Sequence, residues 1–179
     1  MDNQVRKAHL PFDPIERAGE LWDEHFGDAK AMMAVTSVMR VQQLLIKTLD
    51  SALKPFGITF SRYEVLVLLS FSKRGKLPLS KIGERLMVHP TSVTNAIDRL
   101  TAQGLVSRVP DPHDRRMTLA ALTDDGRAMT VDATAALNAL DFGLHGLEDV
   151  NMNALFAVLR TIRQNAGDFP PDTVPQHVD

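Results

Sequence analysis

Apolar residues recur at helical spacing along most of the chain, so the hydrophobic pattern predicts a mainly α-helical protein. The first expected element is a short amphipathic helix over residues 13–26, with Asp13 as its cap and Pro14 at its first position. A longer helix follows over residues 30–54 and is ended by a Pro-x-Gly sequence. Its apolar positions fill more than one narrow stripe, which predicts packing on two sides and a partner outside its own domain.

Two shorter helices are expected next, on either side of a basic connector with the sequence KRGKLP. Ser61 and Glu64 match the S-x-x-E capping box before the apolar run that begins at Val65, and Thr59 is a competing cap. After the connector, the sequence LSKIGERLMV predicts a helix that is capped by Ser80.

A third helix is expected within TSVTNAIDRLTAQG, after a break at the preceding His-Pro pair. Its apolar positions share one helical face and are Val93, Ala96, Ile97 and Leu100. The opposite face carries short polar side chains and one arginine, namely Thr91, Ser92, Thr94, Asn95 and Arg99. Two short strands, LVSRV and MTLAAL, then flank a turn that is rich in Pro, Asp and Arg.

Two further helices are expected before the C-terminus. Thr123 is the predicted cap of a long helix that runs to about Leu147, and Asn151 is the predicted cap of a final helix to about Asn165. Three helices, the last two joined by a tight break, followed by a β-hairpin are typical of a winged helix-turn-helix. The expected fold class is therefore mainly α, with a small β wing.

Composition narrows the possible functions. The chain has 179 residues, a net charge of −2 and no cysteine, which excludes disulfides, thiolate catalysis and cysteine zinc sites. The segment from Lys54 to Arg116 nevertheless holds 11 Lys and Arg against 5 Asp and Glu. A basic excess within one contiguous segment favours a polyanionic partner. No apolar run is long enough for a membrane span and no signal segment begins the chain, so a soluble, cytoplasmic protein is expected.

The third helix carries side chains suited to double-stranded DNA. A major groove accepts one helix, and Ser, Thr and Asn reach phosphates and base edges without clashing, while Arg can pair with guanine. The five polar residues of that helix are therefore the predicted DNA contacts. Asp98 is unfavourable beside phosphate and is expected to pair with a neighbouring cation. Arg108 could contact phosphate, brace the wing or lie beneath a ligand pocket, and a structural role is favoured.

The sequence LSKIGERLMVHPTSVTNAIDRLTAQGLVSRVPDPHDRRMTLAALTDDGR, residues 79–127, resembles the MarR family of bacterial transcription regulators. The shared features are the break between two helices, GLV-x-R, a turn that ends in D-R-R, and A-L-T-x-x-G. In that family the arginine of the turn enters the minor groove, and the aspartate two residues before it holds that side chain. The resemblance implies these roles for Arg116 and Asp114. Arg115 is expected to contact phosphate.

The wider resemblance covers roughly residues 28–166 and implies a homodimer on a pseudo-palindromic operator, with half-sites about 34 Å apart. The implied parts are an N-terminal extension (1–28), dimerisation helices (30–54 and 124–166), a winged part (about 57–123) and a flexible tail (167–179). Family members are commonly repressors that small aromatic or phenolic ligands release from DNA. The candidate pocket residues for such a ligand are Trp22, Met33, Arg40, Phe60 and Tyr63.

Other functions have less support in the sequence. We find no nucleophile elbow, phosphate-binding glycine loop or metal-ligand pair, so no enzyme, cofactor or metal site is expected. None of the six histidines has another at the i,i+4 spacing of helical metal ligands. The alternative that remains is a winged-helix module that has lost DNA binding and uses its basic segment to bind an acidic protein.

Overall fold

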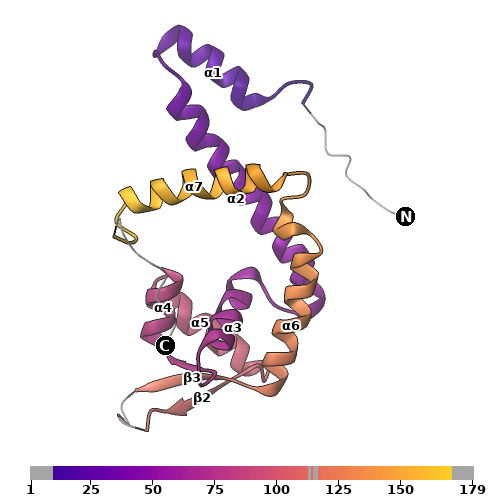
Figure 1. Ribbon diagram of the computed structural model, residues 1–179, viewed down its shortest axis with the longest axis vertical. Coiled ribbons are helices and arrows are strands. Elements are labelled where there is room, and N and C mark those ends of the chain that lie inside the picture. The colour runs from indigo at the N-terminus through magenta and orange to yellow at the C-terminus, as the bar shows by residue number, and fades with distance from the viewer. Residues whose placement is uncertain (1–9, 113, 115–116, 171–179) are drawn as a thin grey trace, which may run out of the picture. The chain divides into compact units, whose positions relative to one another are not determined.

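The computed structural model describes residues 10–112, 114 and 117–170 (Figure 1). Its internal contacts divide the chain into two compact units, Met1–Lys47 and Thr48–Asp179. The first unit holds α1 (Pro14–His25) and most of α2 (Lys30–Leu53). The second unit holds the end of α2 and η1 (Lys54–Phe56), α3 (Phe60–Phe71), β1 (Lys76–Pro78), α4 (Leu79–Leu86), α5 (Pro90–Ala102), β2 (Val106–Pro110), β3 (Thr118–Leu122), α6 (Asp124–Asn138), η2 (Asp141–Gly143) and α7 (Asp149–Asn165).

The first helix begins as its sequence predicts. Asp13 Oδ1 accepts a hydrogen bond from the backbone N–H of Ile15 at 2.8 Å, and Pro14 occupies the first helical position. Within the first unit, α1 meets α2 at Gly19, which is buried. A Cβ at this position would overlap the Sδ of Met33, so the missing side chain allows the two helices to approach closely.

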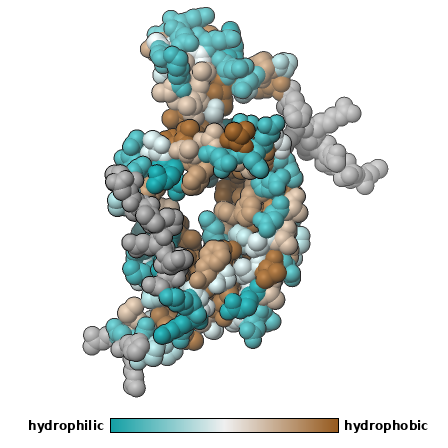
Figure 2. Space-filling model, viewed as in Figure 1, coloured by the Kyte–Doolittle hydropathy of each residue, from teal (hydrophilic) through white to brown (hydrophobic). Residues whose placement is uncertain are grey.

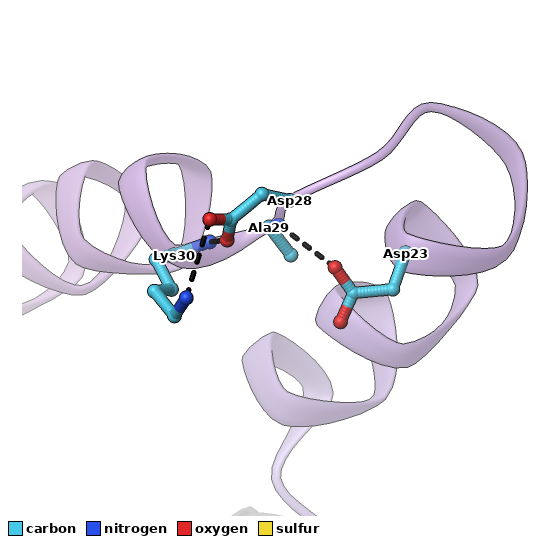
Figure 3. Close-up of polar contacts among 4 residues, drawn as sticks. All are labelled: Asp23, Asp28, Ala29 and Lys30. Carbon is cyan, nitrogen blue, oxygen red and sulfur yellow. Dashed lines mark hydrogen bonds and ion pairs between the residues drawn. The ribbon is translucent and has the colours of Figure 1, made fainter.

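The turn between α1 and α2 is held by two carboxylates (Figure 3). Asp23 accepts a hydrogen bond from the backbone N–H of Ala29 at 2.9 Å. Asp28 accepts one from the backbone N–H of Lys30 at 3.0 Å and also pairs with the Lys30 ammonium at 3.2 Å. These carboxylates satisfy N–H groups that the first turn of a helix leaves without intrahelical partners.

The start of α3 differs from the predicted capping box. The N-cap is Thr59 rather than Ser61, and the Thr59 side chain makes no capping hydrogen bond. Its hydroxyl lies 3.0 Å from that of Ser61 instead. The backbone N–H of Phe60 donates to Asp50 Oδ1 at 2.7 Å. A carboxylate from the preceding helix has therefore replaced the local cap, because a charged acceptor forms the stronger hydrogen bond.

The basic connector contains a strand that the sequence did not reveal. β1 pairs antiparallel with β3, so the sheet has three strands in the order β1-β3-β2. Leu77 of this strand lies opposite Ala120 and is only 7% exposed. A strand of three residues is too short to show an alternating pattern, so its pairing depends on contacts with a distant segment.

The helix starts around the helix-turn-helix also differ from the prediction. α4 has Pro78 as its N-cap, so Ser80 lies inside the first turn rather than at the cap. α5 begins at Pro90, and His89 caps it by accepting the N–H of Thr91 at 3.2 Å through Nδ1. The His-Pro pair is therefore the start of the third helix, because proline fits the first helical position.

The sixth helix is shorter than predicted. It ends at Asn138 rather than near Leu147. The first residues beyond it in the left-handed conformation are Asp141 and Phe142, at φ +46° and +51°. Gly143 and Gly146, both at φ +84°, follow, and glycine adopts this conformation without strain. The apolar residues beyond Asn138 continue the helical spacing, but the backbone there is not α-helical.

The core of the second unit lies where α3, α4, α5 and α6 pack against one another and against the sheet. Each of these elements contributes at least one fully buried side chain. Burying such a side chain stabilises the fold by roughly 1.5–3 kcal/mol. The largest of them are Leu53, Leu66, Leu69, Ile82, Ile97, Leu100, Leu137, Val93 and Val106.

The last helix begins earlier than predicted. It starts at Asp149 with Glu148 as its N-cap, rather than at the predicted cap Asn151.

Unlike the core elements, α2 and α7 keep large apolar side chains at the surface of the chain. Figure 2 shows brown, apolar surface where Figure 1 places α7 and the middle of α2. The exposed residues are Val35, Val38, Met39, Val41, Leu44 and Ile46 of α2, with Leu155, Phe156, Val158 and Ile162 of α7. None of the described helices is both long and apolar enough to cross a bilayer.

Candidate nucleic-acid interface

The fifth helix has two chemically distinct faces. Val93, Ile97 and Leu100 are at most 2% exposed and anchor it in the core, as the spacing predicts. Ala96, the fourth apolar position, is half-buried. The five predicted DNA contacts, Thr91, Ser92, Thr94, Asn95 and Arg99, are all exposed. An anchored helix with a row of short polar side chains is the form that enters a major groove.

The C-terminal end of α5 is tied to neighbouring segments. The Gln103 side-chain amide donates to the backbone carbonyl of Gly57 at 2.8 Å, which links the end of α5 to the start of α3. Gly104 adopts φ +73°, and Leu105 N–H then donates to the Leu100 carbonyl at 3.0 Å. These contacts fix the orientation of the polar face relative to the rest of the second unit.

The carboxylate on α5 is paired, as predicted for Asp98. Arg108 Nη2 of strand β2 donates to Asp98 Oδ1 at 2.6 Å. The side chains are 36% and 59% exposed, respectively, so the pair contributes only about 0–1 kcal/mol to stability. Its larger effect is electrostatic, because the guanidinium neutralises a charge that would repel phosphate. The pair is consistent with the structural role favoured for Arg108 and leaves that role a prediction.

The turn between α4 and α5 is tight. Met87 adopts the left-handed conformation at φ +54°, and Val88 N–H donates to the Gly83 carbonyl at 3.1 Å. Gly83 is buried, and a Cβ there would lie 3.3 Å from the Val88 carbonyl oxygen and from Val93. The absence of a side chain at Gly83 thus lets the turn approach α4 and sets the angle between the two helices.

The wing is the hairpin of β2 and β3, paired from Val106 opposite Leu122 to Pro110 opposite Thr118. It extends beyond the helices of the second unit (Figure 1). Its turn is closed by hydrogen bonds from Asp111 N–H to the Met117 carbonyl at 3.0 Å and from Met117 N–H to the Asp114 carbonyl at 2.9 Å. Asp114 is exposed at this turn, whereas Arg115 and Arg116 lie outside the described residues.

A cavity beside α5 was not anticipated from the sequence. It has a volume of about 820 Å³ and lies between the start of α3 and the polar face of α5. Thr59, Ser61 and Arg62 form its α3 side, and Asn95 and Arg99 lie on its α5 side. The sequence shows an arginine directly after the Thr-Phe-Ser sequence at the start of this helix, but only the fold brings that arginine beside α5.

The candidate ligand-pocket residues of the first unit are distributed along α1 and α2. Trp22 is 39% exposed, with its ring centroid 5.0 Å from that of Phe26. Met33 is half-buried beside Gly19. Arg40 is exposed and donates to the Gln43 side chain at 3.3 Å.

Phe60 and Tyr63, the candidate pocket residues of the second unit, lie on α3. Their rings are stacked with centroids 5.9 Å apart, and Tyr63 is 5% exposed. The Tyr63 hydroxyl lies 2.9 Å from the Thr134 hydroxyl, which joins α3 to α6. Burial raises the pKa of the neighbouring Glu64 carboxyl. Tyr63 is therefore part of the packing between helices, and Glu64 sits in a partly desolvated position.

No cluster of three or more potential metal ligands occurs among the residues that the structure describes. The predicted DNA-contacting side chains of α5 are hydroxyls, an amide and a guanidinium group, and such groups bind phosphate and base edges.

Comparison with known proteins adds independent information. The MarR family model matches residues 58–118. The chain is 31% identical to YhbI, an uncharacterized HTH-type transcriptional regulator of Bacillus subtilis, over 69% of this chain and 75% of that protein.

Two solved structures are similar over most of their length. Sco5413, a MarR family transcriptional regulator from Streptomyces coelicolor, is 55% identical with a TM-score of 0.73, covering 78% of this chain and 96% of that one. CouR from Rhodococcus jostii RHA1, solved bound to p-coumaroyl-CoA, is 26% identical with a TM-score of 0.63, covering 82% and 96%. The similarity therefore extends well beyond the winged part.

Proposed function

The chain belongs to the MarR family and is a DNA-binding transcriptional regulator rather than an enzyme, and on this premise we propose that it is a homodimeric repressor of a pseudo-palindromic operator. The observation that carries the proposal is the division of α5 into a buried apolar face and an exposed polar face. The carboxylate of Asp98, which would oppose binding, is neutralised by Arg108. Thr91, Asn95 and Arg99 are proposed to contact the major groove.

A homodimer is supported by the apolar surface of α2 and α7. Large apolar side chains exposed on a helix, as on each of these two, mark interaction sites in soluble proteins. A single recognition helix makes few phosphate contacts, and a two-fold dimer doubles them on two half-sites about 34 Å apart. We therefore assign the exposed side chains of α2 and α7 to the dimer interface of a cytoplasmic regulator.

Release by a small aromatic ligand is the remaining part of the proposal. CouR, a similar protein, was solved with p-coumaroyl-CoA bound. A ligand releases DNA if it binds more tightly to a dimer whose recognition helices have the wrong separation. The residues predicted to contact such a ligand are Trp22, Met33 and Arg40 in the first unit and, considered separately, Phe60 and Tyr63 in the second.

Binding to the DNA upstream of its own gene is the direct test of the proposed function. In fluorescence anisotropy with that duplex, log K should fall linearly with log salt, by about 0.9 per phosphate contact. DNase footprinting should show two protected half-sites. A protein that ignores the duplex at low salt and instead binds an acidic protein would be the interaction module, and the repressor proposal would fail.

The pairing of Asp98 with Arg108 leads to a second expected result. Arg108→Ala should weaken operator binding about five- to tenfold, because an unpaired carboxylate on the reading face repels phosphate by about 1 kcal/mol. The melting temperature should change little, since the pair is largely exposed. Anisotropy titrations and a thermal melt measure the two quantities.

The double variant Asp98→Asn with Arg108→Ala is the matched control. It should recover most of the affinity, because the repelling charge is removed along with its partner. If the double variant binds as weakly as Arg108→Ala alone, then Arg108 contacts DNA itself and the neutralisation argument is wrong.

A further inference from the structure

The cavity between α3 and α5 has the composition of an anion site. Seven of its lining residues carry polar side chains, namely Thr59, Ser61 and Arg62 at the start of α3 and Ser92, Asn95, Asp98 and Arg99 on α5. Hydroxyl and guanidinium donors in this combination bind phosphate oxygens, and the planar guanidinium can do so with two hydrogen bonds.

The charge balance of the cavity is positive. Among the described residues, neither Arg62 nor Arg99 forms an ion pair. Arg62 makes one long hydrogen bond to the Gly57 carbonyl at 3.4 Å, which leaves most of its donors available. Asp98 also lines the cavity, but Arg108 binds it at 2.6 Å. Two arginines therefore line the cavity, and the carboxylate that lines it with them is already paired.

The cavity and the reading face of α5 share residues. Ser92, Asn95 and Arg99 are proposed to contact DNA and also line the cavity. Each major groove is bordered by two rows of phosphates. If Asn95 contacts a base edge in that groove, one of the two backbone strands would therefore pass beside the cavity. The hydrogen bond from Gln103 to Gly57 holds the α3 side in a defined position relative to α5.

The size of the cavity favours one phosphate of a strand over a free ion. At about 820 Å³ it is as large as a site for a drug-sized molecule, and an isolated phosphate would be enclosed on few sides. A backbone phosphate is already positioned by the rest of the duplex, so a few hydrogen-bond donors are enough to bind it. We infer that this cavity binds a DNA backbone phosphate. Arg62, which lies outside the helix-turn-helix, then fixes the register of α5 on the operator. This inference rests on the proposed function.

Arg62→Gln tests the inference in the full-length protein. Affinity should fall about tenfold, and by a similar factor on an operator and on the same operator with altered bases, because a phosphate contact carries no sequence information. The slope of log K against log salt should shrink by about 0.9 for each lost contact, or about 1.8 for a dimer. Thermal melts should show an unchanged fold.

Arg17→Gln is the matched control, since it makes the same change of formal charge at an arginine that pairs with Glu20 on α1. It should leave affinity and salt slope near those of the parent protein. Equal losses of operator affinity in Arg62→Gln and Arg17→Gln would mean a general effect of net charge and would overturn the inference. A parent-like salt slope for Arg62→Gln would overturn it as well.

Neutral methylphosphonate linkages in the operator identify the phosphate itself. One linkage per half-site should weaken binding of the parent protein and leave Arg62→Gln unaffected, and the position of that linkage locates the contact. If no linkage behaves in this way, the inference is wrong. If inorganic phosphate raises the melting temperature of the parent but not of Arg62→Gln, while operator binding is equal, the cavity binds a free anion instead.

The two proposals fail in different ways. If the parent protein binds no duplex at low salt, the repressor proposal and this inference fall together. If the parent and Arg62→Gln both bind the operator with the expected salt dependence, only the inference that the cavity binds a phosphate is contradicted.

Discussion

Arg116→Ala is expected to weaken operator binding about 10- to 100-fold while the protein stays folded and dimeric. The loss corresponds to about 1–3 kcal/mol, the usual cost of removing an arginine that contacts bases in a groove. An extended guanidinium suits the narrow, electronegative minor groove, and in the sequence Arg116 falls between the residues of β2 and β3. Anisotropy at fixed salt, with size-exclusion chromatography for the dimer, measures both quantities.

Arg115→Ala is the neighbouring control for this prediction. Its proposed partner is a phosphate, so its loss should weaken binding to all duplexes similarly and lower the salt slope by about 0.9 per contact. Arg116→Ala should instead reduce the preference for the operator over unrelated DNA. If the two variants behave alike, the assignment of Arg116 to the minor groove is wrong.

Gly126→Ala is expected to destabilise the fold by about 3 kcal/mol, at the upper end of the cost of overpacking. A Cβ at this position would overlap the backbone carbonyl of Leu105 and lie 2.9 Å from the Leu122 side chain. That carbonyl already accepts the N–H of Thr123 at 3.2 Å, so it cannot move without breaking the junction between the wing and α6. Chemical denaturation followed by circular dichroism measures the loss.

Asp125→Ala provides the comparison for Gly126→Ala in the same helical turn. Asp125 is exposed near the start of α6, and its removal should cost only about 0.3–1 kcal/mol through the helix dipole. A Gly126→Ala protein that is as stable as the parent would contradict the prediction, since alanine is otherwise the better helix former.

The same glycine explains part of the A-L-T-x-x-G sequence. The Thr123 hydroxyl accepts the N–H of Gly126 at 3.0 Å and donates to the Gly104 carbonyl at 2.8 Å. The threonine therefore caps α6 as predicted and also binds the loop that ends α5. The glycine allows the close approach that both bonds require. Only the cap could be expected from the sequence, because the second contact joins residues 19 positions apart.

The two faces of α5 could be predicted closely because their pattern is local. The spacing of Val93, Ile97 and Leu100 defines the buried face within a single helix, and the polar face follows from the same geometry. The pairing of Asp98 with a cation could also be expected, since an unpaired carboxylate opposes phosphate. The spacing could not identify its partner as Arg108, which lies on a separate strand.

The errors occur where a distant group decides a local structure. Asp50 of α2 replaces the predicted Ser61 cap, and β1 exists because β3 lies beside it. The overlong sixth helix is a different error, because apolar periodicity continues past Asn138 while the backbone turns left-handed from Asp141 onward.

By itself the amino-acid order determined the class of fold and the two faces of α5, since both depend on periodicity and spacing within a few turns of chain, and the resemblance of residues 79–127 indicated the family. Tertiary structure alone decided that Arg108 neutralises Asp98, that β1 joins the sheet and that Arg62 stands opposite Arg99 across a cavity. Those contacts join segments separated along the chain, and their geometry depends on how the buried faces of several helices pack together.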